Sequence, residues 1–448
     1  MRLSQPASEP VFFDAEPTKD LFIRMLVRDI DLIPAIVDLV DNSVDGARRM
    51  REEDERYDGL WVRIEVGEQE FRIADNCGGI PLELAQRYAF RFGRPEGMTQ
   101  TKHSVGQFGV GMKRALFKLG THFRIETHTS AEAWVVEVDV ERWRLDPNWR
   151  FEVSSHRRNG AKPEEAGTII VVNPLHEGVA RDFALDTFEP QLADEIRRKH
   201  QDGMNRGLAI ALNQVPLSVD PLELLQSDEL KPIFDQVTFE EPPPPVKVKI
   251  YAGLGPSNPQ TAGWYVYCNG RLVLGPDQSA VTGWGTDLER RIPRFHNQFS
   301  RFRGYVFFDS DDAGRLPWTT TKTGVDANSE VYRNVKQRMV NLMRPVIDFL
   351  NVLDREKEVV PKEEERRESL EEAIAEADPV PLGDVQPSLH FAVPQRIVTR
   401  VASRPPTISI QYRRPRDQVE KVKKALGVNT AYKAGEGTFD YFYEAEIE

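Results

Sequence analysis

Three oxygen-bearing side chains recur at helical spacing near the start of the chain. Asp38, Asn42 and Asp45 lie at positions i, i+4 and i+7, on one face of a helix that we predict from Ile33 to about Arg51. Oxygen ligands of this kind are what a Mg²⁺ ion bound to a phosphate chain requires. Asn42 would supply an amide oxygen to the metal, and Asp38 would orient or deprotonate a water. A solvated helix face gives the same pattern, so that alternative stays open.

A second motif, IADNCGGIP (73–81), joins a predicted strand to a glycine turn. Asp75 ends the strand, where its carboxylate can accept a hydrogen bond from an exocyclic amine such as that of adenine. The glycines allow the backbone to approach a ligand closely. An ordinary Asn/Gly-rich turn remains the alternative.

A third motif, SVGQFGVGMKRALFKLG (104–120), places three glycines before an amphipathic helix predicted to start near Met112. Free N–H groups and the helix dipole make such a loop a phosphate cradle, and Lys113 adds a positive charge. The glycine spacing matches neither the Walker nor the Rossmann pattern. Further on, AGTIIVV places Thr168 at the start of a strand, which alone is uninformative.

The order of the predicted elements indicates an α+β fold, with a mostly antiparallel sheet and helices against one face. A proline-rich break, a charge run and an arginine-bearing tail divide the rest of the chain. We expect an N-terminal arm (1–20), a nucleotide-binding domain (21–186), a second α/β domain (187–353), a charged linker (354–386) and a small C-terminal module (387–448).

In this order and at these intervals, DLVDNSVDGA, DNCGGI, GQFGVGMK and the Gly-Thr at 167–168 resemble the GHKL superfamily of DNA gyrase, the large heat-shock chaperones, histidine kinases and MutL. The resemblance implies a Bergerat-type α/β sandwich that binds ATP and Mg²⁺, with Asp38 as catalytic base and Asn42 as the metal ligand. The nucleotide-binding residues it implies are Asn42, Asp75, Gly79, Ile80, Gly106, Gln107, Phe108, Gly109, Val110, Gly111, Met112, Lys113 and Thr168.

The second domain contains PWTTTKTGV (317–325) ahead of a long predicted helix. In gyrase, MutL and the MORC proteins, a ribosomal-protein-like transducer domain projects a lysine onto the γ-phosphate, and Lys322 lies where that lysine would be. A lysine supplies a point charge for developing phosphate charge; an exposed loop lysine is the alternative. Because histidine kinases lack this domain, the resemblance is nearest to a prokaryotic MORC- or MutL-like ATPase.

Two residues depart from the family pattern. Cys77 stands where the first glycine of the adenine box is usual. Asp38 replaces the usual glutamate and is one methylene shorter, and a misplacement of about 1 Å can cost on the order of a hundredfold in rate. Asp41 is a weaker candidate for the base. We therefore expect a slow or partner-activated ATPase, with a binding-only switch as the alternative.

The composition limits the setting of this chemistry. The net charge of −12 argues against binding nucleic acid through bulk electrostatics, so any such contact needs a local basic patch. Two distant cysteines fit a reducing compartment. We see no apolar run of membrane-spanning length and no secretory signal, so we expect a cytoplasmic protein without a membrane partner.

Family members use ATP to close two subunits into a clamp, so the resemblance implies an ATP-dependent homodimer. The arm at residues 1–20, with Phe12, Phe13 and Phe22 nearby, would strap across the partner, or be a disordered terminus. One hypothesis is a clamp on DNA, in a genome-defence or restriction-linked system, with the six arginines between Val385 and Arg416 as the DNA contact. The other is a chaperone-like or signalling switch acting on an operon-encoded protein.

Overall fold

The computed structural model describes residues 18–28, 30–51, 56–91, 111–158, 160, 162, 165–285, 292–319, 321–357, 370–386, 388–394, 410 and 412–447. By internal contacts the chain divides into two units, residues 1–394 and 395–448, which are described separately.

The first part of unit 1 is an eight-stranded sheet in the order β5-β4-β3-β6-β2-β1-β7-β8. Neighbouring strands run antiparallel except for β1 and β7, which are parallel, so the predicted α+β class with a mostly antiparallel sheet is confirmed. Its strands are β1 (Trp61–Val66), β2 (Phe71–Asp75), β3 (His122–His128), β4 (Ala133–Asp139), β5 (Val153–Arg157), β6 (Gly167–Val172), β7 (Ala209–Leu212) and β8 (Val215–Pro216).

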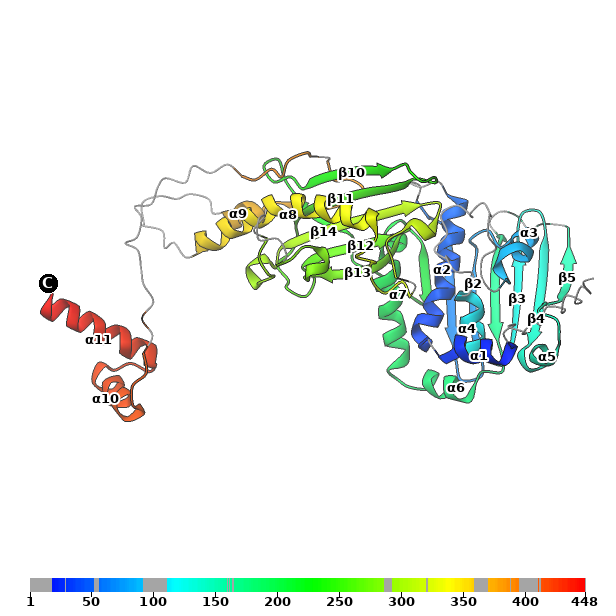
Figure 1. Cartoon of the computed structure of the whole chain (residues 1–448), viewed down its shortest axis with the longest axis horizontal. Coiled ribbons are helices and arrows are strands. Elements are labelled where there is room, and N and C mark those ends of the chain that lie inside the picture. The colour runs from blue at the N-terminus through cyan, green and yellow to red at the C-terminus, as the bar shows by residue number, and fades with distance from the viewer. Residues whose placement is uncertain are drawn as a thin grey trace, which may run out of the picture. The chain divides into compact units, whose positions relative to one another are not determined.

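Helices cover this sheet (Figure 1). They are α1 (Lys19–Arg28), α2 (Leu32–Met50), α3 (Leu82–Leu84) with a π-helical turn at Ala85–Ala89, α4 (Gly111–Leu119), α5 (Val140–Leu145), α6 (Glu177–Phe183) and α7 (Phe188–Asn205). Helix α2 contacts both α4 and α7. Its apolar positions recur at helical spacing, and Arg48 and Arg49 in its last turn complement the helix dipole.

The second part of unit 1 is a five-stranded sheet in the order β10-β11-β14-β12-β13. Helix α8 (Glu330–Lys357) packs along one face of this sheet (Figure 1). The strands are β10 (Ile233–Phe239), β11 (Val246–Leu254), β12 (Gly263–Cys268), β13 (Arg271–Asp277) and β14 (Phe302–Ser310), with short 3₁₀ turns at Ala280–Thr282, Asn297–Phe299 and Ala313–Arg315.

The opposite face of the second sheet carries a smaller apolar cluster that includes Tyr267 and Tyr305. It is closed by a two-stranded sheet of β9 (Glu223–Gln226) and β15 (Asp378–Pro381). Short helix α9 (Leu370–Ala375) contacts α8. Part of the segment that we expected to be a charged linker is therefore folded against the second sheet.

Strand β7 (Ala209–Leu212), which we assigned to the second domain, extends the first sheet. The preceding helix α7 buries Leu192 and Ile196 in the first core. The predicted domain boundaries themselves stay predictions. Unit 2 contains α10 (Arg416–Leu426) and α11 (Ala431–Glu446), which contact each other. The aromatic tail of the chain therefore lies in a helix that the sequence analysis did not predict.

Membership of α7 in the first core can be tested by truncating Leu192, which is fully buried. We expect Leu192→Ala to lower the free energy of unfolding by about 2–5 kcal/mol, because it removes buried methyl groups and leaves a cavity. Leu185→Ala is the matched control, since Leu185 is 56% exposed and should change stability by no more than about 0.5 kcal/mol. Urea unfolding followed by tryptophan fluorescence measures both, and equal effects would contradict the assignment.

Candidate nucleotide site

The acidic face of α2 is buried. Asp38, Asp41 and Asp45 are 6%, 1% and 3% exposed, so the alternative of a solvated helix face is wrong. Removing a carboxylate from water costs several kcal/mol unless cations or hydrogen bonds compensate it. The structure supplies such compensation from three separate parts of the chain.

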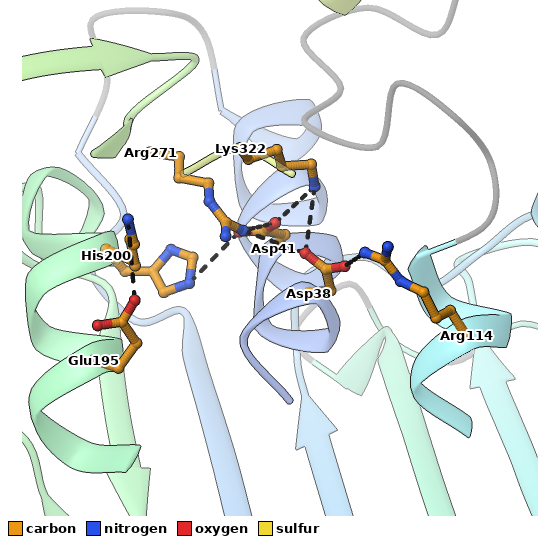
Figure 2. Close-up of polar contacts among 8 residues, drawn as sticks. Asp38, Asp41, Arg114, Glu195, His200, Arg271 and Lys322 are labelled. Carbon is orange, nitrogen blue, oxygen red and sulfur yellow. Dashed lines mark hydrogen bonds and ion pairs between the residues drawn. The ribbon is translucent and has the colours of Figure 1, made fainter. Parts of the chain in front are cut away.

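Asp38 lies between cations from α4 and from the second sheet (Figure 2). Its Oδ2 accepts a hydrogen bond of 2.7 Å from Arg114 Nη2 on α4. Its Oδ1 is 3.7 Å from Lys322 Nζ and 3.6 Å from Arg271 Nη1, beyond hydrogen-bond distance. Oδ1 is therefore the oxygen of Asp38 that can accept a hydrogen bond from a water.

The start of α4 lies directly beside Asp38. A Cβ atom at Gly111 would be 3.4 Å from Asp38 Oδ2, so the glycine leaves room next to the carboxylate. Met112, the next residue, is buried and faces the neighbouring pocket. The N-terminus of α4 thus meets the acidic face of α2, an arrangement that favours bound anions at this point.

Asp41 is the most heavily compensated of the carboxylates. It pairs with Arg271, the first residue of β13, and accepts a hydrogen bond of 2.8 Å from Lys322 Nζ. On its other side His200 of α7 places Nε2 3.6 Å from Oδ1 (Figure 2). Burial opposes the charge, but Arg271 and Lys322 prevail and lower the pKa of Asp41 to about 2. A carboxylate held in this way is poorly placed to replace Asp38 as a base.

His200 contributes no positive charge to this cluster. Complete burial lowers the pKa of its imidazole to about 4, so the ring is neutral near pH 7. Neither ring nitrogen has a hydrogen-bond partner among the residues that the structure describes. The charge of Asp41 is consequently balanced by Arg271 and Lys322.

Lys322 reaches α2 from a tight turn in the second part of unit 1. Its backbone N–H donates to Thr319 O at 2.9 Å, and Thr319 N–H donates to Gly324 O at 3.0 Å. Lys322 itself has φ = 55°, in the left-handed region that non-glycine residues seldom occupy. The structure brings Lys322 to the predicted catalytic face; its role at a phosphate stays a prediction.

A pocket lies against the neighbouring face of α2, which Leu39, Asn42 and Ser43 line and Asp38 does not. Six of the residues predicted to bind nucleotide line it together, although they come from four separate segments of sequence. They are Asn42, Asp75, Gly79, Ile80, Met112 and Thr168. The side-chain Nδ2 of Asn42 is buried and has no hydrogen-bond partner among the described residues, so this N–H donor is available to an acceptor on a ligand.

Asp75 is held rigidly at the floor of this pocket. Its Oδ2 accepts a hydrogen bond from Ser43 Oγ at 2.7 Å, and its Oδ1 accepts from the backbone N–H groups of Cys77 and Thr168 at 2.9 and 3.2 Å. Burial raises the pKa of this carboxyl, and the three hydrogen bonds oppose that rise. Asp75 therefore has a fixed orientation from which it can accept a hydrogen bond from a ligand.

The turn after β2 explains the unusual cysteine. The left-handed positions fall on Gly78 and Gly79, with φ of 89° and 67°, whereas Cys77 precedes them and packs inward. A side chain at Gly79 would collide with the backbone carbonyl of His128. Burial raises the pKa of the Cys77 thiol, which makes the group inert, and the described residues contain no cluster able to hold a metal with it.

Of the predicted phosphate loop, the structure describes Gly111, Met112 and Lys113. Lys113 is fully buried and its Nζ donates to Ala89 O at 2.7 Å; burial lowers its pKa to about 7. The structure therefore directs this amine toward the π-helical turn. The remaining predicted residues of the loop lie outside the described residues: Gly106, Gln107, Phe108, Gly109 and Val110.

Several residues of the site were not found from the sequence. Ser43 is adjacent to Asn42 in the motif and could have been considered as a partner for a neighbouring carboxylate. The three cluster residues contributed from elsewhere, Arg114, His200 and Arg271, carry no local signal, since their partners lie far away in sequence.

This arrangement, a buried acidic helix face beside a pocket with an anchored aspartate at a strand end, defines a nucleotide-binding domain. Residues 30–168 match the family described as histidine kinase-, DNA gyrase B-, and HSP90-like ATPase. This segment therefore belongs to the GHKL superfamily, as its motifs predicted, and a domain of this kind binds ATP. No curated protein matches the chain. Among the described residues, every helix is too short or too polar to cross a membrane.

Gly46 on α2 offers a test of the pocket's construction. A Cβ atom there would collide with the backbone carbonyl of Cys77, so Gly46→Ala must displace either α2 or the glycine turn. We expect a loss of about 1–3 kcal/mol in the free energy of unfolding together with weaker ATP binding.

The matched control for that substitution is Gly178→Ala in helix α6, where a Cβ atom meets nothing within 4 Å. This variant should be stabilised by up to about 1 kcal/mol, because alanine restricts the unfolded chain. Thermal unfolding and calorimetric ATP titration compare the two. Unchanged stability and affinity in Gly46→Ala would rule out the close packing of α2 on the turn.

Proposed function

We propose that the protein is a Mg²⁺-dependent ATPase that hydrolyses ATP slowly or on activation, and that nucleotide binding drives its dimerisation. The observation that carries this proposal is the convergence of Asp38, Arg114 and Lys322 beside the Asp75 pocket. A base, a cation from the nucleotide domain and a cation from the second part of the unit are the groups that phosphoryl transfer needs, because it depends on positioning and charge.

Asp75 and its pocket would hold the adenine. Its Oδ1 and Oδ2 are fixed by Ser43, Cys77 and Thr168, so the carboxylate is preorganised to accept a hydrogen bond from the exocyclic amine. Gly79 lines the pocket and allows the turn to lie against the backbone of β3, where a Cβ atom would collide with His128 O. Preorganisation of this kind lowers the ordering cost of binding.

Asn42 fits the role of magnesium ligand. It lines the pocket and lies four residues from Asp38 on α2. An amide oxygen is a suitable donor for Mg²⁺, which when bound would neutralise charge on the phosphates.

Asp38 would orient the attacking water through Oδ1 and accept its proton, while Arg114 keeps Oδ2 in place. Lys322, 3.7 Å from Asp38 Oδ1, would meet the terminal phosphate and stabilise the charge that develops on it. This assignment treats the second part of unit 1 as a transducer domain and favours the MORC- and MutL-like branch of the superfamily.

The first test is steady-state Mg-ATP hydrolysis by the wild-type protein and by Asp38→Asn. We expect the variant to lose at least about a hundredfold in turnover, because the amide cannot accept the proton. Chelation of Mg²⁺ by EDTA should abolish turnover in the wild type.

The matched control is Asp38→Glu, which restores the side chain usual in the family and should retain or raise the rate. Equal turnover in wild type and Asp38→Asn would exclude Asp38 as the base. If ATP binds but no variant turns it over, the protein is a nucleotide-binding switch.

As the macromolecular target we propose DNA, held within an ATP-closed dimer, in a prokaryotic defence or restriction-linked setting. Between Val385 and Arg416 the chain has six arginines and no acidic residue. Those that the structure describes in this stretch, Arg413, Arg414 and Arg416, are all exposed. Arginines of this kind can neutralise phosphates although the whole chain carries a net charge of −12.

DNA binding should weaken steeply with salt, and replacing Arg413, Arg414 and Arg416 with glutamine should lower the slope of log K against log [salt] by up to about 3. Fluorescence anisotropy with duplex DNA at several salt concentrations measures this. Replacing Lys421, Lys423 and Lys424 on α10 of the same unit with glutamine controls for net charge. Binding without salt dependence would contradict the proposal and favour the chaperone-like alternative with a protein partner.

A further inference from the structure

Two cations from the second part of unit 1 reach the same buried carboxylate. Arg271 and Lys322 both pair with Asp41, and both lie within 3.7 Å of Asp38 Oδ1. A single carboxylate needs only one cation to balance its charge. The proposed function uses Lys322 and leaves Arg271 without a role.

The two cations differ in how firmly they are fixed. Arg271 is 3% exposed and follows the β12–β13 turn, which Asn269 fastens to β14 through two hydrogen bonds of 3.0 Å with the backbone of Ser310. Arg271 is therefore held between this anchored turn of the second sheet and its ion pair with Asp41 on α2.

Lys322, in contrast, sits in a turn with left-handed backbone and reaches Asp41 through a flexible four-carbon side chain. Its ammonium is a point charge that can be redirected, whereas the guanidinium of Arg271 is a rigid fork. Lys322 is thus suited to move from Asp41 to a phosphate, and Arg271 is suited to remain paired with Asp41.

We propose that Arg271 is a positioning residue that keeps Asp41 neutralised when Lys322 turns to the terminal phosphate of ATP, and so makes the lysine releasable. This inference depends on the proposed function. Without Arg271, departure of Lys322 would leave Asp41 buried and uncompensated, which is strongly unfavourable.

The consequence is specific to the terminal phosphate. ADP lacks the terminal phosphate, so Lys322 can stay on Asp41 when ADP binds, and the affinity for ADP should not change when Arg271 is replaced. ATP binding requires Lys322 to leave Asp41, so replacing Arg271 should lower the affinity for ATP alone. A merely structural arginine would weaken both nucleotides alike.

The experiment measures dissociation constants of Mg-ADP and of a non-hydrolysable Mg-ATP analogue by calorimetry. In Arg271→Gln we expect the ratio of analogue affinity to ADP affinity to fall at least about tenfold relative to wild type. In Arg271→Gln/Asp41→Asn the ratio should recover, because the hydrogen bond that ties Lys322 to the charge of Asp41 is then lost.

Arg48→Gln is the matched control. Arg48 also lies on α2, is buried, and also joins the two parts of the unit through a 2.7 Å ion pair with Asp309 of β14. It contacts neither Asp38 nor Asp41 in the described structure, so its substitution should leave the ratio unchanged.

An unchanged ratio in Arg271→Gln, an equal fall in Arg48→Gln, or no recovery in the double variant would overturn the inference while nucleotide binding stands. If wild type binds neither nucleotide, the proposed function fails with it. Should Arg271→Gln not fold, Asp41→Asn alone decides the matter: it frees Lys322, so its ratio should equal or exceed that of wild type, and a tenfold fall would overturn the inference.

Discussion

The structure of unit 1 depends on the burial of carboxylates on one face of α2. Asp38 and Asp41 are almost inaccessible to water, and an uncompensated charge in such a place would be strongly destabilising. Their cations come from α4, from the first residue of β13 and from the turn at Lys322. The same ion pairs therefore order this face of α2 and connect the second sheet to the nucleotide-binding domain.

The pocket is linked to this face through short, stiff connections. Ser43, next to Asn42 on α2, donates a hydrogen bond to Asp75 at the end of β2. Gly46, one turn further along α2, allows the helix to approach the backbone of Cys77. A displacement of α2 caused by its charged partners would consequently move Asp75 and the glycine turn of the proposed adenine site, because both contacts are too close to absorb the shift.

Local patterns made much of this predictable. Periodicity predicted α2 and the strand that ends at Asp75, and the family resemblance predicted six of the residues that line the pocket, since both signals lie within short stretches of sequence. The ion pairs with Asp41 could not be predicted, because Arg271 and Lys322 are 230 and 281 residues from it. The motif at 317–325 marked Lys322 for a phosphate but not for Asp41, and nothing local marked Arg271. The placement of β7 was missed for a related reason, because a strand's own pattern does not reveal which sheet it joins.

The contacts of Asp38 show how an aspartate is accommodated where the family usually has a glutamate. An aspartate keeps its carboxylate about one carbon–carbon bond, roughly 1.5 Å, closer to α2 than a glutamate would. There it lies 2.7 Å from Arg114 and beside Gly111, whose missing side chain leaves space next to Oδ2. Oδ1 faces Lys322 and Arg271 at 3.7 and 3.6 Å. The space that the longer glutamate side chain would occupy is therefore lined by cations. A water in this space that bridges Asp38 to a phosphate would be strongly oriented by their charges. In the proposed mechanism, the charges around Asp38 would therefore position the water in place of the longer glutamate side chain. The proposed turnover would then depend on where the second part of unit 1 places Lys322.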